Sequence, residues 1–348
     1  MIERIICADA VVGLAQIESG TVDMCVTSPP YYGLRDYGIS GQIGLEETPD
    51  EYITRLVSVF REVRRVLRDD GTLWVNIGDS YAGGGNARGQ NAPLFAKQAS
   101  NKGATGQLSN HAKNIKPSAI GCKPKDLIGI PWMLAFALRA DGWYLRNDII
   151  WNKPNPMPES VTDRCSKSHE YIFMFSKEQH YYFDHIAIKE PVAEETIARQ
   201  QRAISGDHKY VDGCGGQKKQ TINQPRPNVK YATDQHGQRP NTKELRRAAG
   251  LPDPDYEMRN KRSVWTVSTK GFSGEHFACF PPDLIRPCIL AGSRRGGAVL
   301  DTFFGAGTTG IVALEEMRGY IGIELNPEYA DLAAKRIDEK MINYKLAL

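Results

Sequence analysis

The fold of this chain is decided by the stretch Val22-Asp23-Met24-Cys25-Val26-Thr27-Ser28-Pro29-Pro30-Tyr31-Tyr32-Gly33. Its apolar first half predicts a buried parallel strand, so the two prolines stand in the loop at the strand's carboxyl end. Consecutive prolines have fixed φ angles and no backbone N–H, and they leave rigid carbonyl oxygens between the Ser28 hydroxyl and the Tyr31 ring. Acceptors beside an aromatic plane suit a planar group with an exocyclic amine, such as a nucleobase turned out of its helix.

A second informative stretch lies near the other end of the chain and is rich in glycine. It reads Val299-Leu300-Asp301-Thr302-Phe303-Phe304-Gly305-Ala306-Gly307-Thr308-Thr309-Gly310. The glycine spacing fits the dinucleotide fingerprint, with Glu324 about twenty positions on to bind ribose hydroxyls. A nicotinamide enzyme and a purely structural glycine turn are therefore alternatives. Only one strand–helix unit is expected around and after Glu324, which disfavours nicotinamide because no second mononucleotide half follows.

Taken together, the two stretches resemble a known family. Ser28-Pro29-Pro30-Tyr31 resembles the catalytic motif of the S-adenosylmethionine-dependent amino-methyltransferases of DNA, and the Asp301 stretch resembles their cofactor motif. The catalytic motif comes first in the chain, which resembles the beta group of that family. The resemblance implies an α/β fold with a doubly wound, mostly parallel seven-stranded sheet and an inserted target-recognition region. It also implies S-adenosyl-L-methionine as the cofactor.

The resemblance assigns roles to individual residues. Ser28, Pro29, Pro30 and Tyr31 would be catalytic, with Ser28 Oγ and the Pro29 carbonyl accepting from the exocyclic amine while Tyr31 stacks on the base. Because Ser at this position is commoner among enzymes of the cytosine N4 amine, we expect cytosine, with adenine N6 as the alternative. The residues expected to bind the cofactor are Asp9, Phe280, Pro281, Asp301, Phe303, Gly305, Gly307, Thr308 and Glu324.

One of these expectations, Asp9, has a plainer alternative. Asp9 follows a short apolar strand, where an Asp is as often a simple helix cap. Phe280 and Pro281 belong to Gly274–Pro282, a segment that resembles the part of the family closing over the methionine end of the cofactor. Cys288 superficially suggests a nucleophile, but its apolar helical neighbours favour a buried structural thiol.

Composition excludes several classes of protein. The chain has 348 residues, 41% of them hydrophobic and 24% charged. No run approaches the roughly 18 apolar residues of a membrane span, and the N-terminus lacks a secretory signal. The seven cysteines have no paired spacing, which predicts reduced thiols, a cytoplasmic location and no metal site.

Charge is distributed unevenly, although the net charge is only +3. Residues 82–125 carry seven Lys or Arg and no Asp or Glu, and residues 191–262 carry fourteen basic and nine acidic side chains. Basic, Gly- and Asn-rich segments fit loops that follow phosphates, with a solvated linker as the alternative. We therefore predict double-stranded DNA as the partner and leave open a cognate restriction endonuclease and the oligomeric state.

These patterns predict a division of the chain. Residues 1–190 and 261–348 would form the catalytic and cofactor-binding domain, 82–125 a basic mobile insert, and 191–260 the target-recognition region. Thr48-Pro49-Asp50-Glu51 is a strong helix start, and we expect the arginines of that helix to be solvated. The other expected elements are helices at 127–139, 284–290, 308–317 and 326–344 and strands at 3–8, 72–77, 145–151, 171–175 and 320–324.

Rival functions remain at this stage. A Pro-Pro-Tyr loop can hold other planar amides, so methylation of RNA or of a protein amide is one rival. A DNA-binding module without catalysis is another, although the intact Ser-Pro-Pro-Tyr and glycine-rich stretches favour an enzyme.

Overall fold

The computed structural model describes residues 2–34, 38–82, 121–193, 195, 258–269 and 280–346, and the side chains among them up to residue 342. The predicted mobile insert at 82–125 and the predicted target-recognition region at 191–260 lie almost wholly outside these residues. The chain divides into two compact units, Met1–Ala187 with Arg262–Leu348, and Ile188–Lys261.

An eight-stranded sheet organises the larger unit, in the order β1-β10-β9-β2-β3-β5-β4-β8. The strands from β1 to β3 in this order are parallel, β5 is antiparallel to both of its neighbours, and β4 pairs with β8 in parallel. The predicted α/β, mostly parallel fold is confirmed, with β8 as a short additional edge strand. The strands are β1 (Glu3–Cys7), β2 (Val22–Thr27), β3 (Leu67–Ile77), β4 (Tyr144–Asn152), β5 (His169–Ser176), β8 (Val264–Thr266), β9 (Ala298–Asp301) and β10 (Gly319–Glu324).

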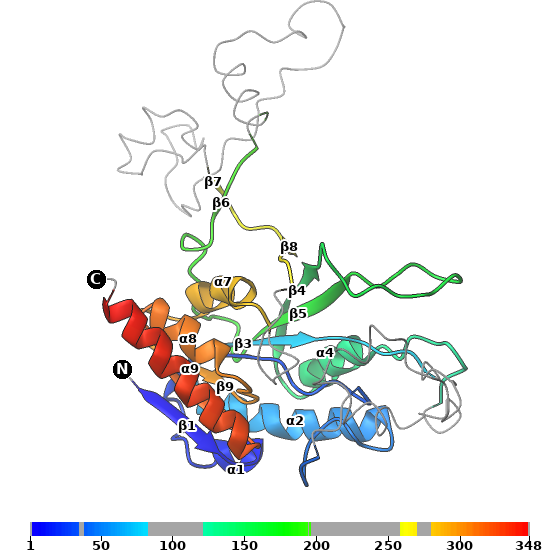
Figure 1. Ribbon diagram of the computed structural model, residues 1–348, viewed down its shortest axis with the longest axis horizontal. Coiled ribbons are helices and arrows are strands. Elements are labelled where there is room, and N and C mark those ends of the chain that lie inside the picture. The colour runs from blue at the N-terminus through cyan, green and yellow to red at the C-terminus, as the bar shows by residue number, and fades with distance from the viewer. Residues whose placement is uncertain are drawn as a thin grey trace, which may run out of the picture. The chain divides into compact units, whose positions relative to one another are not determined.

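Helices cover both faces of this sheet (Figure 1). On one face α1 and α4 pack against α2, and on the other α7 packs against α8, which also contacts α9. The buried core residues of the first group include Leu14, Leu56 and Leu134, which meet the sheet residues Cys25 and Leu73. The helices are α1 (Ala10–Leu14), α2 (Pro49–Val66), α4 (Ile130–Ala140), α7 (Pro282–Gly292), α8 (Thr308–Glu315) and α9 (Pro327–Leu346). No described helix is long and apolar enough to cross a membrane.

Helix α2 shows how local sequence sets an element. The Thr48 hydroxyl accepts from the Glu51 N–H, and the Glu51 carboxylate accepts from the Thr48 N–H, which together form a capping box worth about 1 kcal/mol. The arginines expected to be solvated are at least partly exposed, and they also bind neighbouring segments. Arg65 donates to the Leu14 and Ile17 carbonyls, and Arg55 forms an ion pair with Glu46. Long arginine side chains at a helix edge reach neighbouring loops, which a helical pattern does not reveal.

Two predicted boundaries also needed correction. Strand β3 begins at Leu67, directly after α2, rather than at Thr72, because Leu67 pairs with Val22 and a register shift between Val22 and Met24 absorbs the intervening residues. Helix α4 begins at Ile130 rather than Leu127. Its first turn is fixed by the Asp79 carboxylate, which accepts from the Gly129 and Ile130 N–H groups.

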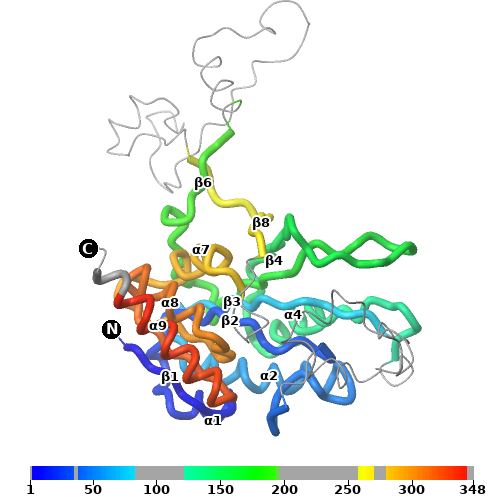
Figure 2. The backbone as a smooth tube through the Cα atoms, viewed as in Figure 1, coloured from blue at the N-terminus to red at the C-terminus, as the bar shows by residue number. Residues whose placement is uncertain are grey.

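The sheet brings the two ends of the chain together. Figure 2 shows the blue N-terminal strands beside the orange and red C-terminal segments. Strand β2 pairs directly with β9, with Met24 opposite Val299 and Cys25 opposite Leu300. The proline-rich loop after β2 and the glycine-rich loop after β9 therefore leave the same edge of the sheet side by side.

The smaller unit is described only at its two chain ends. Strands β6 (Glu190–Pro191) and β7 (Met258–Arg259) form an antiparallel pair, and Arg259 Nε donates to Glu190 Oε1 at 3.0 Å. These contacts join the two chain ends of the unit. The predicted role of residues 191–260 in target recognition stays a prediction.

Candidate active site

A cleft of about 950 Å³ lies at the carboxyl edge of the parallel strands. This volume is at the upper end of the range for small-molecule sites. It opens where strand carboxyl ends gather, which is where open α/β sheets bind ligands. The predicted site residues that line it are Asp9, Ser28, Pro29, Pro30, Tyr31, Phe280, Phe303, Gly305 and Glu324. Pro281, Asp301, Gly307 and Thr308 are described but lie behind this lining.

Asp301 lies beneath the glycine-rich loop and holds it in place. Its side chain is 1% exposed and accepts three hydrogen bonds, from Thr27 Oγ1 at 2.6 Å, Thr309 Oγ1 at 2.6 Å and the Phe303 N–H at 3.1 Å. Burial raises the pKa of this carboxyl, and the three donors oppose that rise. The Thr27 bond ties the loop after β9 to the residue that precedes Ser28, so Asp301 aligns the two loops.

The glycines of this loop serve conformation and close packing. Gly307 is the N-cap of α8 at a φ of +77°, a left-handed conformation that favours glycine, and a Cβ there would lie 2.9 Å from Ala333 Cβ. Gly310 faces Ile337 and Phe304, which a Cβ would approach to 2.8 and 2.9 Å. Thr308 follows Gly307 as the first residue of α8 and is buried. These residues shape the loop from behind the cleft.

Glu324 provides an acceptor at the cleft wall, at the end of β10. Its Oε2 accepts from the Gly305 N–H at 2.7 Å and its Oε1 from the Asn326 N–H at 2.8 Å. Burial raises the pKa of this carboxyl, while the backbone donors oppose the rise. Each oxygen has a second lone pair for another donor. Two oriented acceptors beside Gly305 and Phe303 fit the vicinal hydroxyls of a ribose, so the residues present suit an adenosyl cofactor.

Asp9 and the Phe280–Pro281 pair complete this part of the cleft. Asp9 caps α1, since its Oδ1 accepts from the Val11 N–H at 2.9 Å, and it also lines the cleft. Both interpretations of Asp9 are therefore compatible with its position. Phe280 lines the cleft, whereas Pro281 is buried as the N-cap of α7. Cys288 is fully buried within α7, and its Sγ lies 3.7 Å from the Leu284 carbonyl.

The proline-rich loop rests on the start of α2. The Tyr52 hydroxyl donates to the Pro30 carbonyl at 2.7 Å, and the Gly33 N–H donates to the Gly44 carbonyl at 2.8 Å. Tyr32 is buried, and its ring lies 5.5 Å from the Tyr52 ring. The Pro30 carbonyl is thus engaged inside the protein. No such bond to the Pro29 carbonyl is seen among the described residues, and Pro29 lines the cleft.

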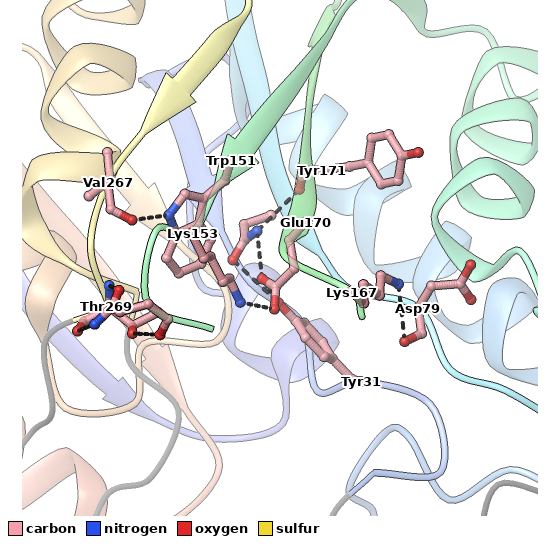
Figure 3. A network of polar contacts seen from close by, with 11 residues as sticks. Tyr31, Asp79, Trp151, Lys153, Lys167, Glu170, Tyr171, Val267 and Thr269 are labelled. Carbon is pink, nitrogen blue, oxygen red and sulfur yellow. Dashed lines mark hydrogen bonds and ion pairs between the residues drawn. The ribbon is translucent and has the colours of Figure 1, made fainter. Parts of the chain in front are cut away.

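Tyr31 is held by residues that sequence reasoning missed (Figure 3). Its hydroxyl donates to Glu170 Oε2 at 2.8 Å and lies 3.4 Å from Asn76 Oδ1. Glu170 also forms an ion pair with Lys153, in which the two side chains are 16% and 17% exposed. Burial raises the pKa of Tyr31 well above its ordinary value, and the Glu170 carboxylate raises it further, so the hydroxyl stays protonated and donates.

The sequence carried only a weak signal for these residues. Glu170 is the second residue of a largely apolar strand, and Asn76 is a polar residue inside another. Lys153 follows β4 in a segment with prolines at positions 154, 156 and 158. A polar side chain in a buried strand needs a partner, and this rule could have marked Asn76 and Glu170.

The sheet order and the cleft at its carboxyl edge match the fold of known S-adenosylmethionine-dependent methyltransferases. The chain superposes on the PvuII DNA methyltransferase, described as cytosine-N4-specific, with a TM-score of 0.56 and 16% identity, covering 98% of this chain and 91% of that one. It also superposes on a Thermus thermophilus protein solved in complex with S-adenosyl-L-methionine, with a TM-score of 0.53 and 21% identity, covering 97% and 94% of the two chains. At these identities the matches establish the fold.

The sequence comparisons are more specific. The profile of the DNA methylase family, which comprises N6 and N4 enzymes, matches residues 22–335. The chain is 46% identical to the type II methyltransferase M.XycI of Xanthomonas campestris pv. cyanopsidis over 336 residues, which is 96% of this chain and 87% of the relative. It is 45% identical to M.SmaI of Serratia marcescens over 96% of this chain and 90% of the relative.

This chain therefore belongs to the DNA methylase family of N6 and N4 amino-methyltransferases. Its cofactor is S-adenosyl-L-methionine. Its relatives include type II methyltransferases, the class of enzyme found in restriction–modification systems.

Proposed function

We propose that this chain methylates the exocyclic N4 amine of cytosine at a specific site in duplex DNA, after the target base turns out of the helix. The observation that carries the proposal is the shared cleft, in which Ser28, Pro29 and Tyr31 stand opposite Phe303, Gly305 and Glu324. The direct pairing of β2 with β9 and the Thr27–Asp301 hydrogen bond of 2.6 Å fix the two loops relative to each other.

The residues of the cleft suggest how the transfer proceeds. The exocyclic amine is a poor nucleophile because its lone pair is delocalised into the ring. Ser28 Oγ and the Pro29 carbonyl would accept its hydrogens and favour the tetrahedral nitrogen that develops during transfer, while Tyr31 stacks on the base. S-adenosyl-L-methionine supplies an activated methyl group when bound. Glu324 would orient it through the ribose hydroxyls, and Asp301 would act through the loop rather than by contact.

Adenine N6 is the alternative target, since the family includes enzymes of both amines. Both amines present similar geometry to the two acceptors, so the choice of cytosine rests on Ser28. A cognate restriction endonuclease as partner and a cytoplasmic location also remain proposals. Residues 82–125 and 191–260 would contact the duplex on this proposal because of their basic composition.

The test is expression in a methylation-free host, followed by single-molecule sequencing of the host DNA. We expect a short motif that carries a methyl group on a cytosine exocyclic nitrogen. Methylated adenine would overturn the assignment of cytosine as the target base but would leave the proposed mechanism intact. Unmodified DNA, with methyl transfer to RNA or protein in a competition assay, would reject the function.

Two variants make the same experiment specific. Ser28→Ala should leave the host DNA unmodified. Ser58→Ala is the matched control, because among the described residues its hydroxyl donates within its own helix, to the Arg55 carbonyl. Full methylation by Ser28→Ala would show that Ser28 does not have the proposed role.

A further inference from the structure

Glu170 stands at the centre of a polar network that includes Tyr31 and Lys153 (Figure 3). Its Oε2 accepts hydrogen bonds from the Tyr31 hydroxyl at 2.8 Å and from Asn76 Nδ2 at 3.3 Å, and its Oε1 accepts one from Lys153 Nζ. Strands β2, β3, β4 and β5 or the loops that follow them each contribute one of these residues. A carboxylate that is about 16% exposed is retained in such a place only where its charge is compensated.

The partners of Glu170 are themselves fixed. Asn76 Nδ2 also donates to the Tyr171 carbonyl at 3.1 Å, and Lys153 Nζ lies 4.2 Å from the centroid of the Trp151 ring. Trp151 in turn donates through Nε1 to the Val267 carbonyl at 2.8 Å. Glu170 therefore has little freedom to follow Tyr31 if the ring moves. The network thus restrains the position of the Tyr31 hydroxyl.

The Tyr31 ring is also confined by the backbone. A Cβ on Gly78 would lie 2.6 Å from Tyr31 Cε2, a distance that real side chains do not adopt. The ring therefore packs against Gly78 near its tethered hydroxyl, because the ring atoms closest to Gly78 are Cε2, Cδ2 and Cζ. The two constraints together limit how the ring can move in the cleft that it lines.

We propose that Glu170 and Lys153 are positioning residues for methyl transfer, with Glu170 fixing the stacking plane of Tyr31 and Lys153 compensating the charge of Glu170. The proposal rests on the proposed function, because it assigns Tyr31 the target base. Misplacing an aligned group by about 1 Å can lower a rate by about 100-fold, so a tether of this kind has a measurable effect.

The test compares single-turnover methyl transfer on the duplex site that sequencing identifies. Glu170→Gln keeps the shape and loses the ion pair, and Tyr31→Phe removes the hydroxyl and keeps the ring. We expect each to lower the rate by about 10-fold while the dissociation constants for duplex and cofactor stay within about 2-fold. The double variant should be no slower than Tyr31→Phe alone, because Glu170 acts on the base only through the Tyr31 hydroxyl. Lys153→Arg should retain the rate, and Lys153→Met should lose it.

A matched control separates positioning from general destabilisation. Glu315→Gln also removes a carboxylate from a half-buried ion pair, with Arg286 at 2.7 Å and 19% exposure of the Glu side chain, in α8 and outside the cleft lining. It should leave the single-turnover rate unchanged. If Glu170→Gln does not fold, the single-turnover rate of Tyr31→Phe tests the proposal by itself. A wild-type rate in Tyr31→Phe overturns the proposal.

A second readout does not depend on activity. With 3-fluorotyrosine incorporated, the ¹⁹F resonance of Tyr31, assigned by its loss in Tyr31→Phe, should shift and broaden in Glu170→Gln but not in Glu315→Gln. An unchanged resonance, or additive rate losses in the double variant, would overturn the inference. A wild-type protein that leaves DNA unmodified while this resonance still responds to Glu170→Gln would reject the proposed function and keep the tether.

Discussion

The two sides of the cleft are assembled in different ways. On the glycine-loop side, comprising Asp301, Phe303, Gly305 and Glu324, the supporting contacts come largely from backbone and hydroxyl groups within residues 301–326. On the Tyr31 side, comprising Ser28, Tyr31, Asn76, Lys153 and Glu170, side chains from four strands meet across as many as 139 positions of sequence. A local motif builds the first side, and only tertiary pairing builds the second.

This difference predicts how variants should behave. Changes on the Tyr31 side should alter the rate of methyl transfer without altering cofactor binding. Changes on the glycine-loop side should alter cofactor binding or stability. The Thr27–Asp301 hydrogen bond links the two sides, so a change at Asp301 should affect both.

The largest effect is expected for Ser28→Ala. Losing a hydrogen-bond acceptor used in the transition state should lower the single-turnover rate by about 10²- to 10³-fold, as for other groups of this kind. Calorimetry should give an unchanged cofactor affinity, because Ser28 belongs to the Tyr31 side. Weaker cofactor binding in this variant would contradict the division of the cleft.

Asp301→Asn should affect both sides. The amide nitrogen would face hydroxyl and backbone donors at one of the two oxygen positions, and leaving such groups unsatisfied costs about 1–3 kcal/mol each. Thermal unfolding should therefore occur at a lower temperature, and both cofactor affinity and transfer rate should fall. A fall in cofactor affinity alone, or in transfer rate alone, would show that the loops are not coupled through Asp301.

The pH dependence of cofactor binding should distinguish Glu324 from the Tyr31 side. Burial raises the pKa of Glu324, so it gains a proton at a higher pH than an ordinary glutamate does. The protonated form loses an acceptor for a ribose hydroxyl. Affinity should therefore be highest above this raised pKa and fall by up to about 10-fold per pH unit as the pH drops through it.

Titration calorimetry at several pH values checks this expectation. The fall should be absent in Glu324→Gln, whose affinity is lower but flat with pH. A variant on the other side of the cleft, Glu170→Gln, should retain the full pH dependence. The same slope in wild type and Glu324→Gln would assign the titration to another group.

The smallest effect is expected for Tyr52→Phe. It removes the hydrogen bond to the Pro30 carbonyl, a contact of about 0.5–1.5 kcal/mol that supports the proline-rich loop from outside the cleft. The midpoint of thermal unfolding should fall by a few degrees, about 2–4 °C per kcal/mol for a domain of this size. The transfer rate should fall less than in Tyr31→Phe. A larger fall would mean that the Tyr52–Pro30 hydrogen bond matters more for transfer than the Tyr31–Glu170 hydrogen bond.

Sequence reasoning reached the glycine-loop side because its signals are local. Glycines at Gly305, Gly307 and Gly310 and an acid at Glu324 are set by backbone conformation and helix capping, which act over a few residues. Strand β10 and helix α8 lie close to their predicted positions, 320–324 and 308–317, with α8 ending two residues earlier. The two paired motifs also determined the fold class and the family.

The tertiary structure alone decided which predicted residues face the cleft. Asp301 and Thr308 match the family's cofactor motif, but both are buried and neither lines the cleft, and hydrogen bonds hold Asp301 beneath the loop. Glu170, Asn76 and Lys153 carry no motif, because each gains its role only when β2, β3, β4 and β5 pair in one register. Side-chain alternation and local capping can be read along a chain, whereas a contact between distant strands exists only once the sheet has formed.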